Sequence, residues 1–249
     1  MSEEIELKLL KEIKELQKKI DKLEGKSSDG IPIYSFSKIR DKELNSIFDI
    51  EQKIDKNIFF DWFNNDIQIN KEIEDLLKDL INDEADYIIF YDEEDLKMRF
   101  LSPILRSVNF KSDKFRDFYD EKILYQTEKF ILTGEVDFTI STGLRFAKNP
   151  YFFIQEFKRA EEFSNPRPQL LAELISAIEL NNEISMRGAY IIGAIWNFVI
   201  LEKLGKDKYQ YFISQNFDST KIDDLIDIYK SLLFVKNEII AKIEKEKNS

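Results

Sequence analysis

The sequence of 249 residues contains no histidine and no cysteine. These absences exclude histidine-dependent catalytic triads, cysteine nucleophiles, imidazole general bases and zinc sites built from thiolate or imidazole ligands. Any bound metal ion must therefore be held by oxygen ligands. Disulfides are excluded too, which fits a reducing compartment.

A long hydrophobic run is also missing. No apolar stretch approaches the roughly 20 residues that a membrane-spanning helix needs, and the charged N-terminus is unlike a signal peptide. We therefore expect a cytoplasmic protein with no membrane partner. The hydrophobic content of 43%, with 21 phenylalanines, is ample for a folded core.

The net charge of −11 is concentrated in one part of the chain. Residues 41–100 carry 18 acidic and 7 basic side chains, so their net charge equals that of the whole sequence. The remainder is neutral overall and includes Arg159, Arg167 and Arg187, which are candidates for contacting a phosphate backbone or plain surface cations. Nucleic acid is therefore a permitted partner, and the acidic stretch could mimic it or autoinhibit the protein.

Apolar residues at alternating spacings of four and three mark the segment 1–26. They are Leu9, Ile13, Leu16, Ile20 and Leu23, with charged residues between them. This heptad pattern predicts a helix that either forms a homodimeric coiled coil or packs on its own domain. Glycine and serine at 25–30 end the helix.

The rest of the chain divides into a helical region at 31–90, a core at 91–215 and a C-terminal helical segment at 216–249. Period-two and apolar runs predict strands at 121–130, 134–141, 151–158, 188–193, 196–202 and 209–214. We expect a tight turn at Gly134, a helix beginning near Pro168 and a final helix over 221–245. The expected fold class is α/β.

Three charged residues lie within two of the apolar strands. Asp137 is in the run from Gly134 to Ile140, and Glu156 and Lys158 are in the run from Tyr151 to Lys158. Because strand side chains alternate between faces, Glu156 and Lys158 point the same way, and Asp137 can join them from the adjacent strand. Burying unpaired charges is costly, so a divalent cation is an efficient partner for the two carboxylates.

This order of elements, with Asp on the second strand and Glu-x-Lys on the third, resembles the PD-(D/E)XK nuclease superfamily. Residues 91–215 more narrowly resemble the N-terminal nuclease domain of type I restriction enzymes and related bacterial proteins. The matching stretches are Glu93–Pro103, Gly134–Asp137, Ile154–Lys158, Gln169–Ala177 and Gly188–Phe198. The proline that precedes the aspartate in the superfamily is Val136 here. The resemblance implies a restriction-endonuclease-like mixed β-sheet flanked by helices, with helical extensions at both ends.

The resemblance also implies a metal site. Asp137, Glu156 and Glu94 would hold Mg²⁺ or Mn²⁺, with Glu93 as the rival to Glu94. Lys158 would position the attacking water or stabilise the charge that develops on the phosphate.

Two residues at the start of the next helix complete the expected site. Gln169 would orient Lys158 or a phosphate, and Glu173 lies one turn further on the same side. The structural alternatives are a polar cap for Gln169 and an ordinary helix-start carboxylate for Glu94. An edge-strand ion pair is the alternative for Glu156 and Lys158.

The resulting hypothesis is a metal-dependent nuclease, a hydrolase acting by Mg²⁺-assisted cleavage of phosphodiester bonds. DNA is favoured because the resemblance implies it. The alternative is a nuclease-fold module with weak or lost catalysis that serves in protein assembly or nucleic-acid binding.

Overall fold

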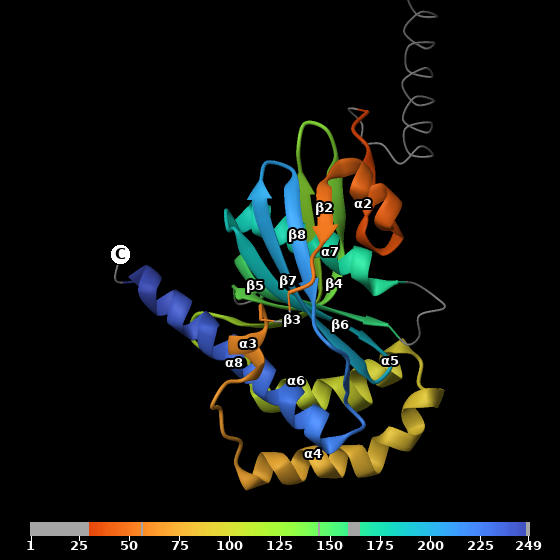
Figure 1. The fold of residues 1–249 in the computed structure, drawn as a ribbon, viewed down its shortest axis with the longest axis vertical. Coiled ribbons are helices and arrows are strands. Elements are labelled where there is room, and N and C mark those ends of the chain that lie inside the picture. Colours follow the sequence, from red (N-terminus) through yellow and green to blue (C-terminus); the bar gives the residue numbers. More distant parts are fainter. Residues whose placement is uncertain (1–29, 56, 144, 159–164, 248–249) are drawn as a thin grey trace, which may run out of the picture.

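The computed structural model describes residues 30–55, 57–143, 145–158 and 165–247 (Figure 1). The predicted coiled coil at 1–26, the homodimer that depends on it and Arg159 lie outside these ranges.

A mixed sheet of nine strands forms the centre of the described chain (Figure 1). The strands are β1 (Ile33–Ser35), β2 (Asp49–Gln52), β3 (Arg116–Gln126), β4 (Ile131–Thr142), β5 (Lys148–Lys158), β6 (Ser185–Ile192), β7 (Ile195–Gly205), β8 (Lys208–Ile213) and β9 (Phe217–Asp218). Their order is β1-β4-β5-β6-β7-β8-β2, with β3 beside β4 and β9 beside β7. The pairs β1–β4, β5–β6 and β2–β8 are parallel, and the others are antiparallel. The predicted α/β class is confirmed.

Helices cover both faces of the sheet. They are α2 (Asp41–Ile47), α3 (Phe60–Phe63), α4 (Lys71–Glu84), α5 (Glu93–Asp95), α6 (Ser102–Val108), α7 (Pro166–Asn181) and α8 (Ile222–Lys247), with a π-helical turn at Leu96–Leu101 and 3₁₀ turns at Phe36–Lys38 and Ala85–Phe90. One face packs on α7 through Leu170 and Leu174, and the other packs on α6 and α8 through Ile104 and Leu225. Figure 1 shows α4, α6 and α8 gathered on the second side.

The segment 31–90 is more than the helical region that its spacing predicts. It contributes β1, which pairs with β4, and β2, which pairs with β8. Trp62 of α3 is fully buried, and its indole N–H donates to the carbonyl oxygen of Ser231 at 2.9 Å. The helical prediction was therefore incomplete, because two short strands gain their hydrogen bonds from distant residues. The acidic stretch is part of the same folded body as the sheet.

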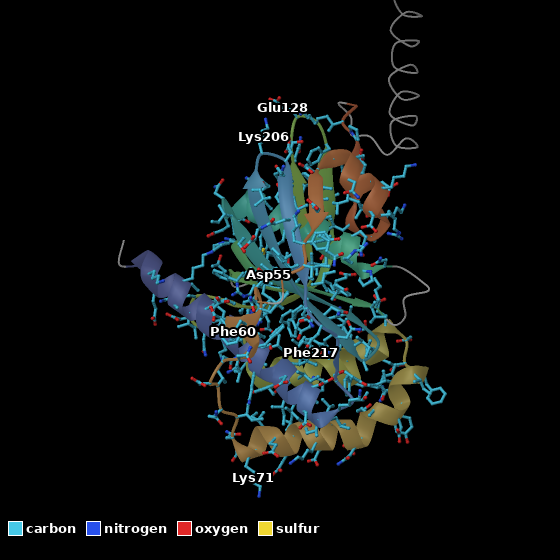
Figure 2. All side chains as sticks on the ribbon, viewed as in Figure 1. Asp55, Phe60, Lys71, Glu128, Lys206 and Phe217 are labelled. Atoms are coloured by element: carbon cyan, nitrogen blue, oxygen red, sulfur yellow. The ribbon has the colours of Figure 1, made fainter. Side chains whose placement is uncertain are left out.

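The predicted turn at Gly134 is wrong. The β3–β4 hairpin turns at residues 127–130, near Glu128 in Figure 2, and Gly134 lies within β4 opposite Ile123. A Cβ atom at position 134 would come within 2.8 Å of Cδ2 of Phe36. Glycine is therefore needed here for the close approach of the Phe36 ring and not for a turn.

The strand predicted at 121–130 is shifted, because β3 begins at Arg116 and its last four predicted residues form the turn, whereas the other predicted strands and the two predicted helices agree with the structure to within three residues. Trp196 and Phe198 are fully buried in the core. Phe217, labelled in Figure 2, packs against the Phe198 ring. Within the described ranges, no helix combines the length and the apolar character needed to cross a bilayer.

Candidate active site

The structure brings Asp137, Glu156, Lys158 and Gln169 into one pocket of about 470 Å³. Asp137 comes from the middle of β4, and Glu156 and Lys158 come from the end of β5. The register pairs Phe138 with Gln155, which places Asp137 beside Glu156 across the two strands. The backbone N–H of Phe157 donates to Oδ2 of Asp137 at 2.8 Å and fixes the carboxylate at this position.

Lys158 is the cation at the centre of the site. Its Nζ lies 2.6 Å from Oε1 of Glu156 and donates to the carbonyl oxygen of Phe157 at 2.8 Å. The side chain is only 15% exposed. This ion pair is therefore largely screened from water, unlike the solvent-facing edge-strand pair that is the alternative explanation of the Glu-x-Lys motif.

Glu93, and not Glu94, reaches this group. Oε1 of Glu93, at the start of α5, lies 3.4 Å from Nζ of Lys158. Glu94 lines a different pocket of about 940 Å³, together with Lys97 and Arg106. Adjacent residues on a helix point in directions about 100° apart, so only one of the two can face β5. The geometry favours the rival assignment, Glu93, as the third acidic residue of the site.

Helix α7 supplies the polar residues above the sheet. The side chain of Asn165 caps the helix by accepting a hydrogen bond from the N–H of Arg167 at 3.0 Å. Gln169, one turn later, donates through Nε2 to Oε1 of Glu173 at 3.1 Å. Both residues are buried. The expectation that Gln169 and Glu173 share one side of this helix is confirmed.

The two buried glutamates carry the strongest electrostatic perturbation. Burial and the neighbouring charge of Asp137 raise the pKa of Glu156 well above its usual value, although Lys158 opposes the shift. Burial and the charge of Glu156 likewise raise the pKa of Glu173. Perturbed carboxyl groups that cluster in a pocket are typical of functional sites.

Burial alone would lower the pKa of Lys158. The charges of Glu156 and Asp137 outweigh burial, so the pKa of Lys158 is raised above its usual value. The ammonium group therefore keeps its proton at neutral pH. It serves as the counter-charge that the two strand carboxylates require.

The hydrogen bonds of the pocket are incomplete. In the described part of the chain, Oε2 of Glu156 and Oε2 of Glu173 are buried and have no hydrogen-bond partner. An unsatisfied buried acceptor costs about 1–3 kcal/mol, and more when it is charged. Such acceptor oxygens would attract a cation or a bound water.

No set of three or more acidic residues in the described ranges is arranged so that it could hold a metal ion by itself. Mg²⁺ at phosphate-handling sites is commonly held by one or two carboxylates, with water and substrate oxygens completing the shell. Asp137 and Glu156 supply two such carboxylates. The residues present therefore fit a Mg²⁺ site that is shared with a phosphate substrate.

The predicted phosphate-binding arginines have internal partners. Arg187 pairs with Glu238 at 3.1 Å and lies over the Trp62 ring, 5.0 Å from its centroid. Its register partner is Phe153, three residues before Glu156, so its side chain is on the opposite face of the sheet from the site. Arg167 lies two residues before Gln169 on α7, and its guanidinium is paired with Asp41 at 2.5 Å.

Sequence reasoning missed several residues that line the pocket. Ser35 and Ser37 reach it from β1 and the following turn, and Lys122 and Glu135 reach it from β3 and β4. The pairing of β1 with β4, which the local sequence does not indicate, brings the serines there. No known family model matches this chain, and no curated protein matches its sequence.

Proposed function

We propose that the protein is a metal-dependent nuclease that hydrolyses phosphodiester bonds, with DNA as the substrate that the motif resemblance favours. One observation carries the proposal. Asp137, Glu156 and Lys158, from two adjacent strands of an apolar sheet, converge on a single pocket beside Gln169. Charges that are costly to bury are kept where a function needs them.

Asp137 and Glu156 are the residues that would hold the metal ion, and Glu93 is the nearest further carboxylate to Lys158. When bound, Mg²⁺ or Mn²⁺ supplies charge neutralisation for the phosphate and lowers the pKa of a coordinated water. Oxygen-only ligation suits both ions. It also matches a chain without histidine or cysteine.

Lys158 provides a fixed positive charge next to the carboxylates. Its raised pKa excludes it as a general base at neutral pH, because the amine stays protonated. It can instead donate hydrogen bonds to a phosphate oxygen or to the attacking water. The Phe157 carbonyl and Glu156 hold the ammonium in place before substrate arrives, so little reorganisation is needed during the reaction.

Gln169 and Glu173 act as positioning residues. The hydrogen bond from Gln169 to Glu173 fixes the amide at the rim of the pocket. The carbonyl oxygen of that amide is then able to accept a hydrogen bond from Lys158 or from water. This role is the one that the motif resemblance implies for Gln169.

Cleavage of supercoiled plasmid and of single-stranded DNA, with Mg²⁺ or Mn²⁺, tests the proposal. Asp137→Asn and Lys158→Met should each lower the cleavage rate by on the order of 10²-fold or more. Calorimetric titration should show metal binding lost in Asp137→Asn and retained in Lys158→Met. Lys129→Met, in the exposed β3–β4 turn, is the matched control and should cleave like the wild type.

Two outcomes would count against the proposal in different ways. Unchanged cleavage in both site variants would remove the site from the reaction. Metal binding that depends on Asp137, without cleavage of any nucleic acid, would instead favour a nuclease-fold module that acts in assembly or binding.

A further inference from the structure

A second pocket, of about 330 Å³, lies at the N-terminal end of α7. Asn165, Asn197 and Asn216 line it with amide groups. Tyr190, Ile192 and Ile195 give it an apolar wall. Its size is at the small end of the range for ligand pockets in proteins.

Strand register places this pocket directly beside the active site. Glu156 of β5 pairs with Tyr190 of β6, which pairs with Asn197 of β7. Two residues further along these strands, Lys158 of β5 pairs with Ile192 of β6. Side chains that are partners across neighbouring strands lie on the same face of a sheet. The second pocket and the active site therefore form one row across the α7 face.

The amides present both donors and acceptors. Asn197 is only 6% exposed, and its Nδ2 donates to Oδ1 of Asn216 at 2.5 Å. Within the described ranges, Oδ1 of Asn197 accepts no hydrogen bond and is not among the buried atoms that lack a partner, so it is open to the pocket. Oδ1 of Asn165 accepts from the backbone N–H of Arg167, so its own NH₂ is directed elsewhere. An amide oxygen that is open to a pocket can accept a hydrogen bond from a ligand or from water.

The charge of this pocket argues for an uncharged ligand. Among the described residues, Arg167 is the cation that lines it, and its guanidinium is paired with Asp41. A phosphate group would have to compete with that carboxylate. A flat heterocycle can instead pack against the isoleucine side chains while amides bind its polar edge, in the way that apolar contacts and hydrogen bonds hold flipped or single-stranded bases.

We infer that this pocket binds one unstacked nucleobase of the substrate strand, next to the phosphate at the Asp137–Glu156–Lys158 site. The inference rests on the proposed nuclease function, and it names the substrate as a single-stranded or locally unpaired nucleotide. Asn197 and Asn216 would determine which base edge is accepted, since an amide offers a donor and an acceptor together.

An abasic scan of a single-stranded deoxyoligonucleotide tests the inference. Fluorescence anisotropy, with no divalent metal present so that no hydrolysis occurs, measures the affinity of the full-length protein for each singly abasic strand. Loss of the bound base should weaken binding on the order of 10-fold at one position of the strand. Asn197→Leu and Asn216→Ala should each abolish that position dependence. Asn64→Ala, at an exposed amide that directly follows α3, is the matched control and should retain the position dependence.

A flat scan in the wild type, or no measurable binding, would overturn the inference, as would a position dependence that survives in both pocket variants. Circular dichroism checks that each variant is folded. If Asn197→Leu does not fold, Asn216→Ala alone tests the pocket. The two proposals fail separately. A clear position dependence without metal-dependent cleavage would support the base pocket and refute the nuclease proposal. Metal-dependent cleavage with a flat scan would support the nuclease proposal and refute the base pocket.

Discussion

Replacing Glu173 by glutamine should stabilise the protein at neutral and alkaline pH. Glu173 is fully buried on α7, and within the described residues its Oε2 has no hydrogen-bond partner. Burial and the charge of Glu156 raise its pKa above the usual 4.5. Glutamine has nearly the same shape and cannot ionise, so the substitution removes the charge and keeps the packing.

The sign and size follow from proton linkage. Below pH 4.5 the carboxyl group is protonated in both folded and unfolded chains, so the substitution should have little effect there. As the pH rises towards the folded-state pKa, the unfolded chain releases its proton first and the native state loses stability, by up to about 1.4 kcal/mol per pH unit. The advantage of Glu173→Gln should therefore open above pH 4.5 and exceed about 1.4 kcal/mol once the pH has risen by more than one unit, as long as the folded-state carboxyl group keeps its proton.

Urea unfolding at several pH values between 4 and 8, without metal, measures the difference. In a chain of this length each kcal/mol should also raise the Tm by about 2–4 °C. Glu179→Gln is the matched control on the same helix. Glu179 is paired with Tyr209 at 2.5 Å and Lys203 at 2.7 Å, so its neutralisation should destabilise the fold. Wild-type and Glu173→Gln curves that run parallel across this pH range would refute the linkage argument.

Three further substitutions test local features of the fold. Gly134→Ala should lower the free energy of unfolding by about 1–3 kcal/mol, because its Cβ would collide with the Phe36 ring, and Phe36→Leu should recover part of the loss in the double variant. Arg187→Met should lower the free energy of unfolding by about 1–2 kcal/mol, because it removes the ion pair with Glu238 and the contact with the Trp62 ring. The same substitution should leave the DNA affinity unchanged in anisotropy titrations. Asn182, at φ 55°, ends α7, so Asn182→Gly should keep the Tm within a degree or two, whereas Asn182→Val should cost about 1–2 kcal/mol.

Local patterns in the sequence predict the long elements well. The strands β4 and β5 and the helix α8 have the period-two or helical spacing that their own residues impose. The short strands β1 and β2 were missed, because three or four residues carry too little periodicity and their pairing is with residues far along the chain. The role of Gly134 was missed for the same reason, since the ring that requires it comes from Phe36.

The site was predictable to the extent that strand alternation determines it. Glu156 and Lys158 are two residues apart on one strand, so their common face follows from the sequence. The choice between Glu93 and Glu94 depends on how α5 is rotated against β5, which one sequence does not determine. The internal pairing of Arg187 depends on the packing of α8 and α3, and composition alone cannot distinguish such an arginine from a surface cation.

Glu173 connects the stability of this fold with its proposed chemistry. A leucine or methionine at this fully buried position of α7 would pack without any cost of desolvation, yet the sequence has a carboxylate next to two others. If its only role were structural, Glu173→Gln would stabilise the protein and leave cleavage unchanged. If it orients Gln169 above Lys158, the same substitution should stabilise the fold and slow cleavage, because an amide at position 173 can turn its NH₂ group, and not its oxygen, towards the Gln169 donor. Stability and cleavage rate measured on this one variant therefore separate a packing residue from a positioning residue.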